Sequence, residues 1–189
     1  MDNLAYKYED ERPYEILNGV IYNMASPRFA HTRAAFRISV MFENFLKGKR
    51  CKVCPEHTDV FFENGDNVIP DMSVVCNPDL IKADGVHGAP DLIVEVLSPS
   101  TAKRDKGYKK DLYERNGVRE YWIVDVNNRT VEVYLLKEGK YVIDNIYMIY
   151  NEQDLECMKD DEKAAIPTSF TTSLYGDDLV LQIADIFEE

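Results

Sequence analysis

The stretch that decides the fold is Asp91-Leu92-Ile93-Val94-Glu95-Val96-Leu97, a nearly continuous apolar run near the middle of the chain. A run of this length and composition is typical of a β-strand that is covered on both faces. Glu95 interrupts the run. Because a charge inside such a strand costs free energy unless it is paired or ligated, Glu95 needs a cationic partner or a metal.

The segment after this strand predicts a helix and further strands. Ser98-Pro99-Ser100-Thr101 supplies cap residues for a helix over about 102–116, and Asn116-Gly117 is a stop signal. We expect the chain that follows to continue as strands and then to form an edge and a short last helix ending near Phe187. The predicted strands cover 121–126, 131–135 and 140–150.

The segment before the central strand predicts a hairpin, a helix and a strand pair. Two short apolar runs flank Asn18-Gly19, which is a hairpin signal. Apolar residues then recur at helical spacing over about 31–47. The strand pair covers 51–63 and 68–75, and a loop follows at 77–90. Together these elements predict an α/β (α+β) fold: a mixed central sheet flanked by helices, in a single domain over residues 1–189.

Composition sets the protein class. The chain has 189 residues, 45% of them hydrophobic and 30% charged, which is typical of a globular protein. No apolar run approaches the roughly 18 residues of a membrane span. The first eleven residues are acidic where a signal peptide would be basic. We therefore expect a cytoplasmic protein without a membrane partner.

Charge is segregated along the chain, although the net charge is −12. Residues 28–52 carry a net +6 and residues 98–119 a net +4, whereas residues 53–97 between them carry −8. Two basic segments that flank an acidic one could bind phosphates around a cation-binding centre. The weak candidates for phosphate contacts are Arg33, Arg37 and Lys106. The ordinary alternative is that these charges only solvate helix faces.

Asp71 and Glu95 form the candidate metal site. Asp71 follows Pro70 at the start of one strand, and Glu95 lies inside the next, so neighbouring strands could bring both carboxylates together. Hard cations such as Mg²⁺ take one or two carboxylates together with waters and phosphate oxygens. Lys109 shares a helical stripe with Leu112 and could point to the same place. The alternatives are a turn role for Asp71 and a metal-free ion pair between Glu95 and Lys109.

The cysteines give no strong motif. Cys51 and Cys54 form a Cys-x-x-Cys, but no second such pair exists to complete a zinc site. Four cysteines in 189 residues are too sparse for a disulfide scaffold. We expect buried thiols, with Cys76 and Cys157 lacking partners.

A family resemblance rests on one long block and several shorter matches. Residues 88–101, GAPDLIVEVLSPST, are followed by Asp105, Lys109, Tyr113, Gly117-Val118 and EYWIVD at 120–125. This block resembles the Uma-two family of restriction-endonuclease-like proteins, which belong to the PD-(D/E)xK nuclease superfamily. The further matches bring its extent to residues 14–187: Tyr14-Glu15, Asn18-Gly19, Ser26-Pro27, His31, Pro70 to Val75 and Ile183 to Phe187.

The resemblance implies a nuclease core in which Mg²⁺ lies between two strand carboxylates. Asp71 matches the aspartate of the superfamily motif, and Glu95 matches its (D/E) position. The lysine position departs from the motif, because Leu97 stands two residues after Glu95. The resemblance suggests that Lys109, on the following helix, takes this role. Glu15 and His31 match family positions and are candidates for supporting contacts to the metal or phosphate.

The resulting hypothesis is a Mg²⁺- or Mn²⁺-dependent endonuclease that hydrolyses DNA phosphodiester bonds. Asp71 and Glu95 are the expected ligands, and Lys109 is the expected electrostatic helper. The alternative is a nuclease-fold protein that no longer cuts and serves as a nucleic-acid-binding or interaction module, which Leu97 and the net charge favour. Cutting both strands would require a homodimer, which the sequence neither shows nor excludes.

Overall fold

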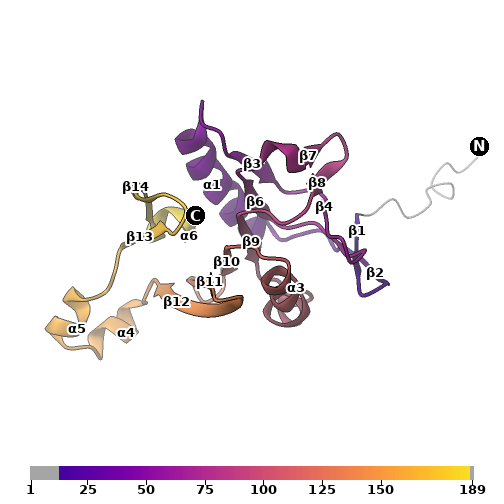
Figure 1. Cartoon of the computed structure of the whole chain (residues 1–189). Coiled ribbons are helices and arrows are strands. Elements are labelled where there is room, and N and C mark those ends of the chain that lie inside the picture. The colour runs from indigo at the N-terminus through magenta and orange to yellow at the C-terminus, as the bar shows by residue number, and fades with distance from the viewer. Residues whose placement is uncertain (1–12, 188–189) are drawn as a thin grey trace, which may run out of the picture.

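The computed structural model describes residues 13–187 and is built around a six-stranded mixed sheet (Figure 1). The order of the strands across this sheet is β12-β11-β10-β9-β6-β3. The acidic segment that argued against a signal peptide lies outside the described residues. The strands are β3 (Lys52–Pro55), β6 (Met72–Val75), β9 (Leu92–Val96), β10 (Glu120–Asp125), β11 (Thr130–Lys137) and β12 (Lys140–Met148).

β9 is the centre of the molecule, as its sequence predicts. All five of its residues are buried. It pairs parallel with β10 and antiparallel with β6, while the other pairs of this sheet are antiparallel. The mixed sheet and its flanking helices confirm the predicted fold class.

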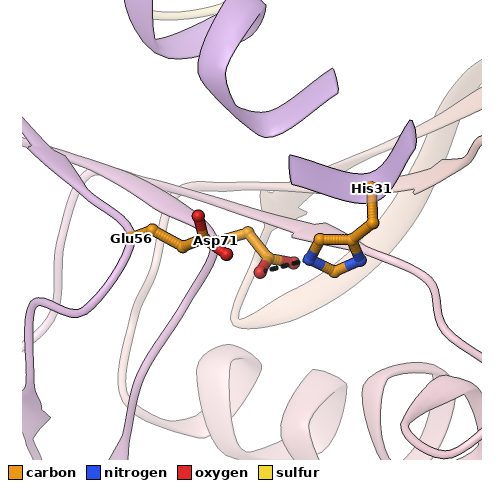
Figure 2. A group of neighbouring side chains, drawn as sticks. All are labelled: His31, Glu56 and Asp71. Atoms are coloured by element: carbon orange, nitrogen blue, oxygen red, sulfur yellow. Dashed lines mark hydrogen bonds and ion pairs between the residues drawn. The ribbon is translucent and has the colours of Figure 1, made fainter. Parts of the chain in front are cut away.

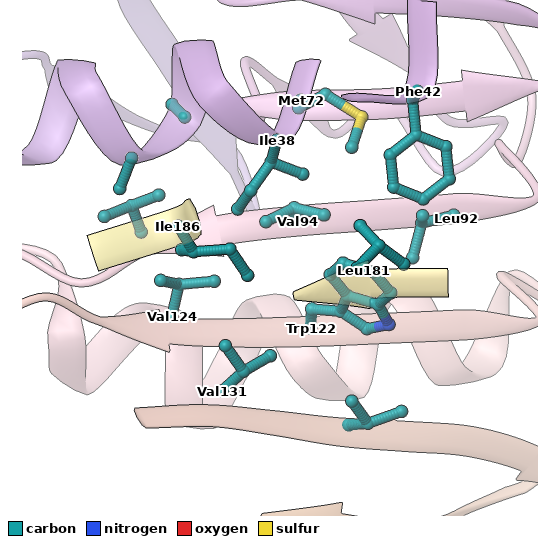
Figure 3. Packing of buried hydrophobic residues seen from close by; sticks show 14 of the residues in the cluster. Ile38, Phe42, Met72, Leu92, Val94, Trp122, Val124, Val131, Leu181 and Ile186 are labelled. Carbon is teal, nitrogen blue, oxygen red and sulfur yellow. The ribbon is translucent and has the colours of Figure 1, made fainter. Parts of the chain in front are cut away.

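One face of the sheet is covered by two helices that come from opposite ends of the chain. These are α1 (Phe29–Leu46) and α6 (Ile183–Phe187), which contact each other. Figure 3 shows Ile38 and Phe42 of α1 packed over Val94 and Trp122 of the sheet, with Ile186 beside them. Burying this apolar stripe fixes α1, and with it the side chains of its first turn, against the sheet.

The other face is covered by the connection from β9 to β10. It consists of α2 (Ala102–Arg104), η3 (Asp105–Lys109) and α3 (Lys110–Arg115). The predicted helix over 102–116 is thus present but contains a π-helical turn, at which Gly107 leaves helical geometry. Residues four apart in a helix lie on the same face. Asp105 and Lys109 therefore both point inward and are buried.

A second, smaller sheet lies beside the first and has the order β2-β1-β5-β4-β8-β7. The predicted hairpin around Asn18-Gly19 is present, and both turn residues have positive φ, as a two-residue hairpin turn requires. The strands are β1 (Tyr14–Leu17), β2 (Val20–Asn23), β4 (Val60–Phe61), β5 (Asn67–Val68), β7 (Ile81–Lys82) and β8 (Gly85–His87).

The strand predictions over 51–63 and 68–75 are each divided between the two sheets. The first contains β3 and β4, and the second contains β5 and β6. Pro70 lies at the second break, where a residue without an N–H cannot continue a ladder. The predicted loop over 77–90 contains η2 (Pro78–Leu80) as well as β7 and β8.

The last part of the chain holds two helices that were not predicted, α4 (Glu152–Glu156) and α5 (Asp160–Ala164). Neither has a buried residue, so neither leaves an apolar periodicity in the sequence. The chain then forms the hairpin of β13 (Ser169–Thr172) and β14 (Gly176–Gln182) and ends in the predicted short helix, α6. No helix within residues 13–187 is long and apolar enough to cross a membrane.

The expectation that Cys76 lacks a partner is wrong, because Cys51 and Cys76 form a disulfide. Lys52 pairs with Val75 in the β3–β6 ladder, so the next residues outward face each other across the two strands. Their Cα atoms are 3.9 Å apart. A low number of cysteines argues against a fold held together by many disulfides, but it does not show which two cysteines the strand register brings together. Cys54 is buried and Cys157 exposed, and both are free.

Asp66 joins the small sheet to the helical connection. Its carboxylate accepts hydrogen bonds from the Asn18 N–H at 2.7 Å, the Tyr108 hydroxyl at 2.7 Å and the Arg115 guanidinium at 3.1 Å. Asn64 donates a fourth, at 2.9 Å. Burial opposes ionisation, but these hydrogen bonds and the charge of Arg115 lower the pKa of Asp66.

Replacing Asp66 by Asn should lower the free energy of unfolding by about 2 kcal/mol at neutral pH, since the amide loses the charge that these donors stabilise. Because the pKa of the folded state is lowered, this stabilisation is present above the unfolded pKa of about 3.9 and is lost as pH falls through the folded pKa. Guanidinium denaturation of wild type and Asp66→Asn should therefore give a difference that shrinks toward roughly pH 3.

Asp177→Asn is the matched control, because Asp177 is exposed. Equal denaturation midpoints for Asp66→Asn and wild type at neutral pH would contradict the role of Asp66.

Candidate metal centre and buried ion cluster

Asp71 lies at the beginning of β6, and its carboxylate is held from two sides. Its Oδ2 accepts a hydrogen bond from the Val96 N–H at 2.6 Å, and its Oδ1 lies 2.8 Å from His31 Nε2. Met72 pairs with Val94 in the antiparallel β6–β9 ladder, so Asp71 stands opposite Glu95 at the end of that ladder. The two carboxylates predicted from the sequence therefore come from facing positions of neighbouring strands.

Glu95 points to the face of the sheet that the helical connection covers. Its Oε1 accepts hydrogen bonds from Lys109 Nζ at 2.9 Å and from the Tyr113 hydroxyl at 2.6 Å. Burial raises the pKa of Glu95 well above its ordinary value; the ammonium of Lys109 opposes this, and the charges of Asp105, Asp71 and Glu15 add to it. Glu95 thus has the cationic partner that its place in a buried strand requires.

Lys109 connects three elements through its ammonium group. Besides Glu95, it lies 2.7 Å from Glu15 Oε1 on β1 and 3.7 Å from Asp105 Oδ1 on η3. Glu15 Oε1 also accepts a hydrogen bond from the Ile69 N–H at 3.0 Å. Burial lowers the pKa of Lys109, but the charges of Glu95, Glu15 and Asp105 outweigh it and raise that pKa, so the ammonium stays charged.

Negative charge exceeds positive charge in this cluster. Glu15, Glu95 and Asp105 are each at most 3% exposed, and they face one buried lysine. Asp105 Oδ1 is buried without a hydrogen-bond partner, and burial raises the pKa of Asp105. Buried carboxylates without compensation must take up a proton or a cation. The cluster therefore takes up a proton or a cation in addition to the ammonium of Lys109.

A second group, which includes Asp71, brings three residue types that can ligate a metal close together. Figure 2 shows Asp71 between Glu56 and His31, and one ligand atom from each of the three residues lies within 4.8 Å of the others. His31 comes from the first turn of α1, and Glu56 follows β3. Although burial lowers the pKa of His31, the hydrogen bond and charge of Asp71, with the charges of Glu56 and Asp105, raise it overall.

Glu56 belongs to no sequence motif and was not predicted. Strand register could have identified it: Pro55 pairs with Met72 in the β3–β6 ladder, so Glu56 stands opposite Asp71 at the end of that ladder. Asp71 thus lies on the middle strand, with Glu56 on one neighbouring strand and Glu95 on the other. All three carboxylates occupy the same end of the sheet.

The other predicted residues have different surroundings. Glu15 joins the Lys109 cluster, and His31 joins Asp71. Of the three phosphate candidates, Lys106 forms an ion pair with Glu132 at 2.6 Å, and Arg37 donates to the Asp185 carbonyl oxygen at 3.3 Å. Arg33 lines a cavity beside α1.

A family model matches most of this chain, and a curated relative is similar over a similar length. A family model named Uma2 and described as "Putative restriction endonuclease" matches residues 2–159. The uncharacterized protein slr1290 of Synechocystis sp. is 31% identical over 151 residues, which cover 79% of this chain and 77% of that protein.

A solved structure shares the fold. It is described as "a putative nuclease belonging to DUF820" from Anabaena variabilis, and it matches with a TM-score of 0.70. The match covers 98% of this chain and 96% of that one at 19% identity, a level that supports a shared fold alone.

Replacing Lys109 by Met should lower the free energy of unfolding by about 3–5 kcal/mol, because it leaves three buried carboxylates without a counter-charge. Adding Glu15→Gln to Lys109→Met should restore part of this loss, since it removes one of the repelling charges. Guanidinium denaturation measures both effects.

Lys103→Met is the control, because Lys103 is exposed on the same helical connection. A Lys109→Met variant as stable as Lys103→Met would show that the ammonium does not hold the cluster together.

Proposed function

This chain belongs to the Uma2 family, described as "Putative restriction endonuclease", and we propose that it is a divalent-metal-dependent endonuclease that hydrolyses DNA phosphodiester bonds. The observation that carries this proposal is the alignment of Glu56, Asp71 and Glu95 at one end of three adjacent strands. Buried Lys109, on the helical connection between β9 and β10, forms an ion pair with Glu95.

The donor set at Asp71 fits Mg²⁺ or Mn²⁺. Both ions take carboxylate oxygens, which Asp71 offers together with Glu95 or Glu56. His31 Nε2 already binds Asp71 Oδ1, so its Nδ1, which has no hydrogen-bond partner among the described residues, is the nitrogen left as a donor, and nitrogen suits Mn²⁺ better than Mg²⁺. The surplus of buried carboxylates supplies the negative charge that such an ion would neutralise.

Several residues have distinct roles in this proposal. The chemistry that a divalent ion supplies when bound is polarisation of the scissile phosphate and acidification of a water molecule. Lys109 orients Glu95 and offers a positive charge toward the phosphate. His31 holds Asp71 in place from α1, and Glu15 holds Lys109 from β1. Arg33, Arg37 and Lys106 contact the DNA backbone and position it.

The proposed setting is a single domain in the cytoplasm, with DNA as the partner. Cutting of both strands would need two copies of the site, and hence a homodimer.

One observation favours a second candidate function. Leu97, at the usual lysine position, is buried, and the ammonium of Lys109 is already surrounded by three carboxylates. A chain in which Lys109 cannot leave this cluster would bind nucleic acid without cutting it. Cleavage assays separate the two functions.

Asp71→Asn and Glu95→Gln should each abolish Mn²⁺- or Mg²⁺-dependent nicking of plasmid DNA, because each removes one negative ligand at the centre of the site. Agarose electrophoresis of plasmid incubated with each variant measures the loss. The control is Asp84→Asn, whose exposed carboxylate forms an ion pair with His87.

Cleavage that persists in both variants would refute this site. Wild-type chain that binds Mn²⁺ and DNA but leaves the plasmid intact would instead support the non-cutting alternative.

Glu56→Gln should weaken Mn²⁺ binding at least tenfold if Glu56 is a ligand, whereas Glu95→Gln should do so if the sequence motif alone forms the site. Isothermal titration with MnCl₂ compares these variants with wild type and Asp84→Asn. Circular dichroism of each variant verifies that the fold is retained. Unchanged affinity in Glu56→Gln would exclude Glu56 from the ligand set.

A further inference from the structure

A cavity of about 610 Å³ opens at the beginning of α1, and none of the carboxylates described above lines it. Three segments line it: the first turns of α1, the turn after β10 and the end of α6. Because β10 runs parallel to β9, the end of β10 and the Asp71–Glu95 pair lie at the same end of the sheet.

The walls of the cavity combine aromatic and cationic groups. Phe29 and Phe187 contribute rings, and Arg33 and Arg129 contribute guanidinium groups from α1 and from the turn after β10. Phe29 is 80% exposed, which is unusual for a large apolar side chain. Within residues 13–187, neither arginine forms an ion pair with a carboxylate. Such a cavity suits a ligand that is flat, apolar on its faces and negatively charged.

The cavity and the candidate metal centre share one helical turn. His31 points from α1 to Asp71, while Phe29, Ala30 and Arg33 line the cavity on another side of the same turn. An α-helix with its side chains is about 10–12 Å across, which corresponds to roughly three base-pair steps of 3.4 Å. A nucleic acid strand at Asp71 would therefore reach the cavity within a few nucleotides.

We propose that this cavity holds one unpaired nucleotide of the DNA strand, its base stacked against Phe29 and its phosphate bound by Arg33 and Arg129. This inference rests on the proposed function and deepens it, because it gives the site a binding position for a nucleotide beside the scissile one. An aromatic ring stacks on any base, and a guanidinium group binds phosphate oxygens in pairs.

The test is the affinity of the full chain for a fluorescent oligothymidylate of about twelve nucleotides, measured by anisotropy in EDTA so that no cleavage occurs. Phe29→Ala and Arg33→Gln should each raise the dissociation constant about tenfold. Phe36→Ala and Lys163→Gln should leave it unchanged. Phe36 is an exposed aromatic residue of the same helix, and Lys163 is an exposed cation outside the cavity.

An oligonucleotide with abasic central positions tests whether the affinity depends on a base. Wild type should bind it about tenfold more weakly than the parent strand. Phe29→Ala should bind the two strands equally, because its stacking contact is already lost. Equal affinity of wild type for the two strands would overturn the inference. A changed molecular mass of Phe29→Ala in light scattering would also overturn it, because the cavity would then be an interface between copies.

The outcome is separable from that of the proposed function. If plasmid nicking depends on Asp71 but the affinity for the strand does not depend on Phe29, the nucleotide-binding role of the cavity is refuted and the proposed endonuclease activity is supported. Binding that depends on Phe29 without any nicking would support the cavity in a protein that binds and does not cut.

Discussion

One buried ammonium group holds together parts of the chain that would otherwise repel one another. Lys109 brings Glu15 of the N-terminal hairpin and Glu95 of the central strand within 3 Å of its Nζ, and Asp105 lies slightly farther away. The arrangement is stable only because the ammonium stays charged and each element is fixed by apolar packing elsewhere. Three buried carboxylates thus face a single ammonium, so the cluster takes up a further proton or cation.

Strand register determines what lies beside Asp71. Its strand is the middle one of three, so the ladders on both sides bring a carboxylate to the same end of the sheet, Glu95 from one neighbour and Glu56 from the other. His31, from the first turn of α1, also contacts Asp71. Packing of α1 on the sheet fixes this imidazole, and the first turn also carries the residues of the neighbouring cavity.

Much of the fold could be predicted from the sequence because it depends on local patterns. The apolar run around Glu95 predicts a covered strand, and Asn18-Gly19 predicts a hairpin turn. The features that escaped prediction depend on pairing between distant segments. Glu56 and the bond between Cys51 and Cys76 both follow from the β3–β6 register, which no pattern within either strand specifies.

The separation of Glu15 from Lys109 has a consequence for biosynthesis. Glu15 precedes Lys109 by 94 residues, so the hairpin leaves the ribosome long before the amine that neutralises it. Contacts between such distant segments form late, because closing a long loop costs conformational entropy before the contact contributes favourable free energy. A nascent or truncated chain that ends before Lys109 therefore contains Glu15 and Glu95 but lacks the ammonium that neutralises them in the folded protein. The complete cluster around Lys109 forms only when more than half of the polypeptide has been made.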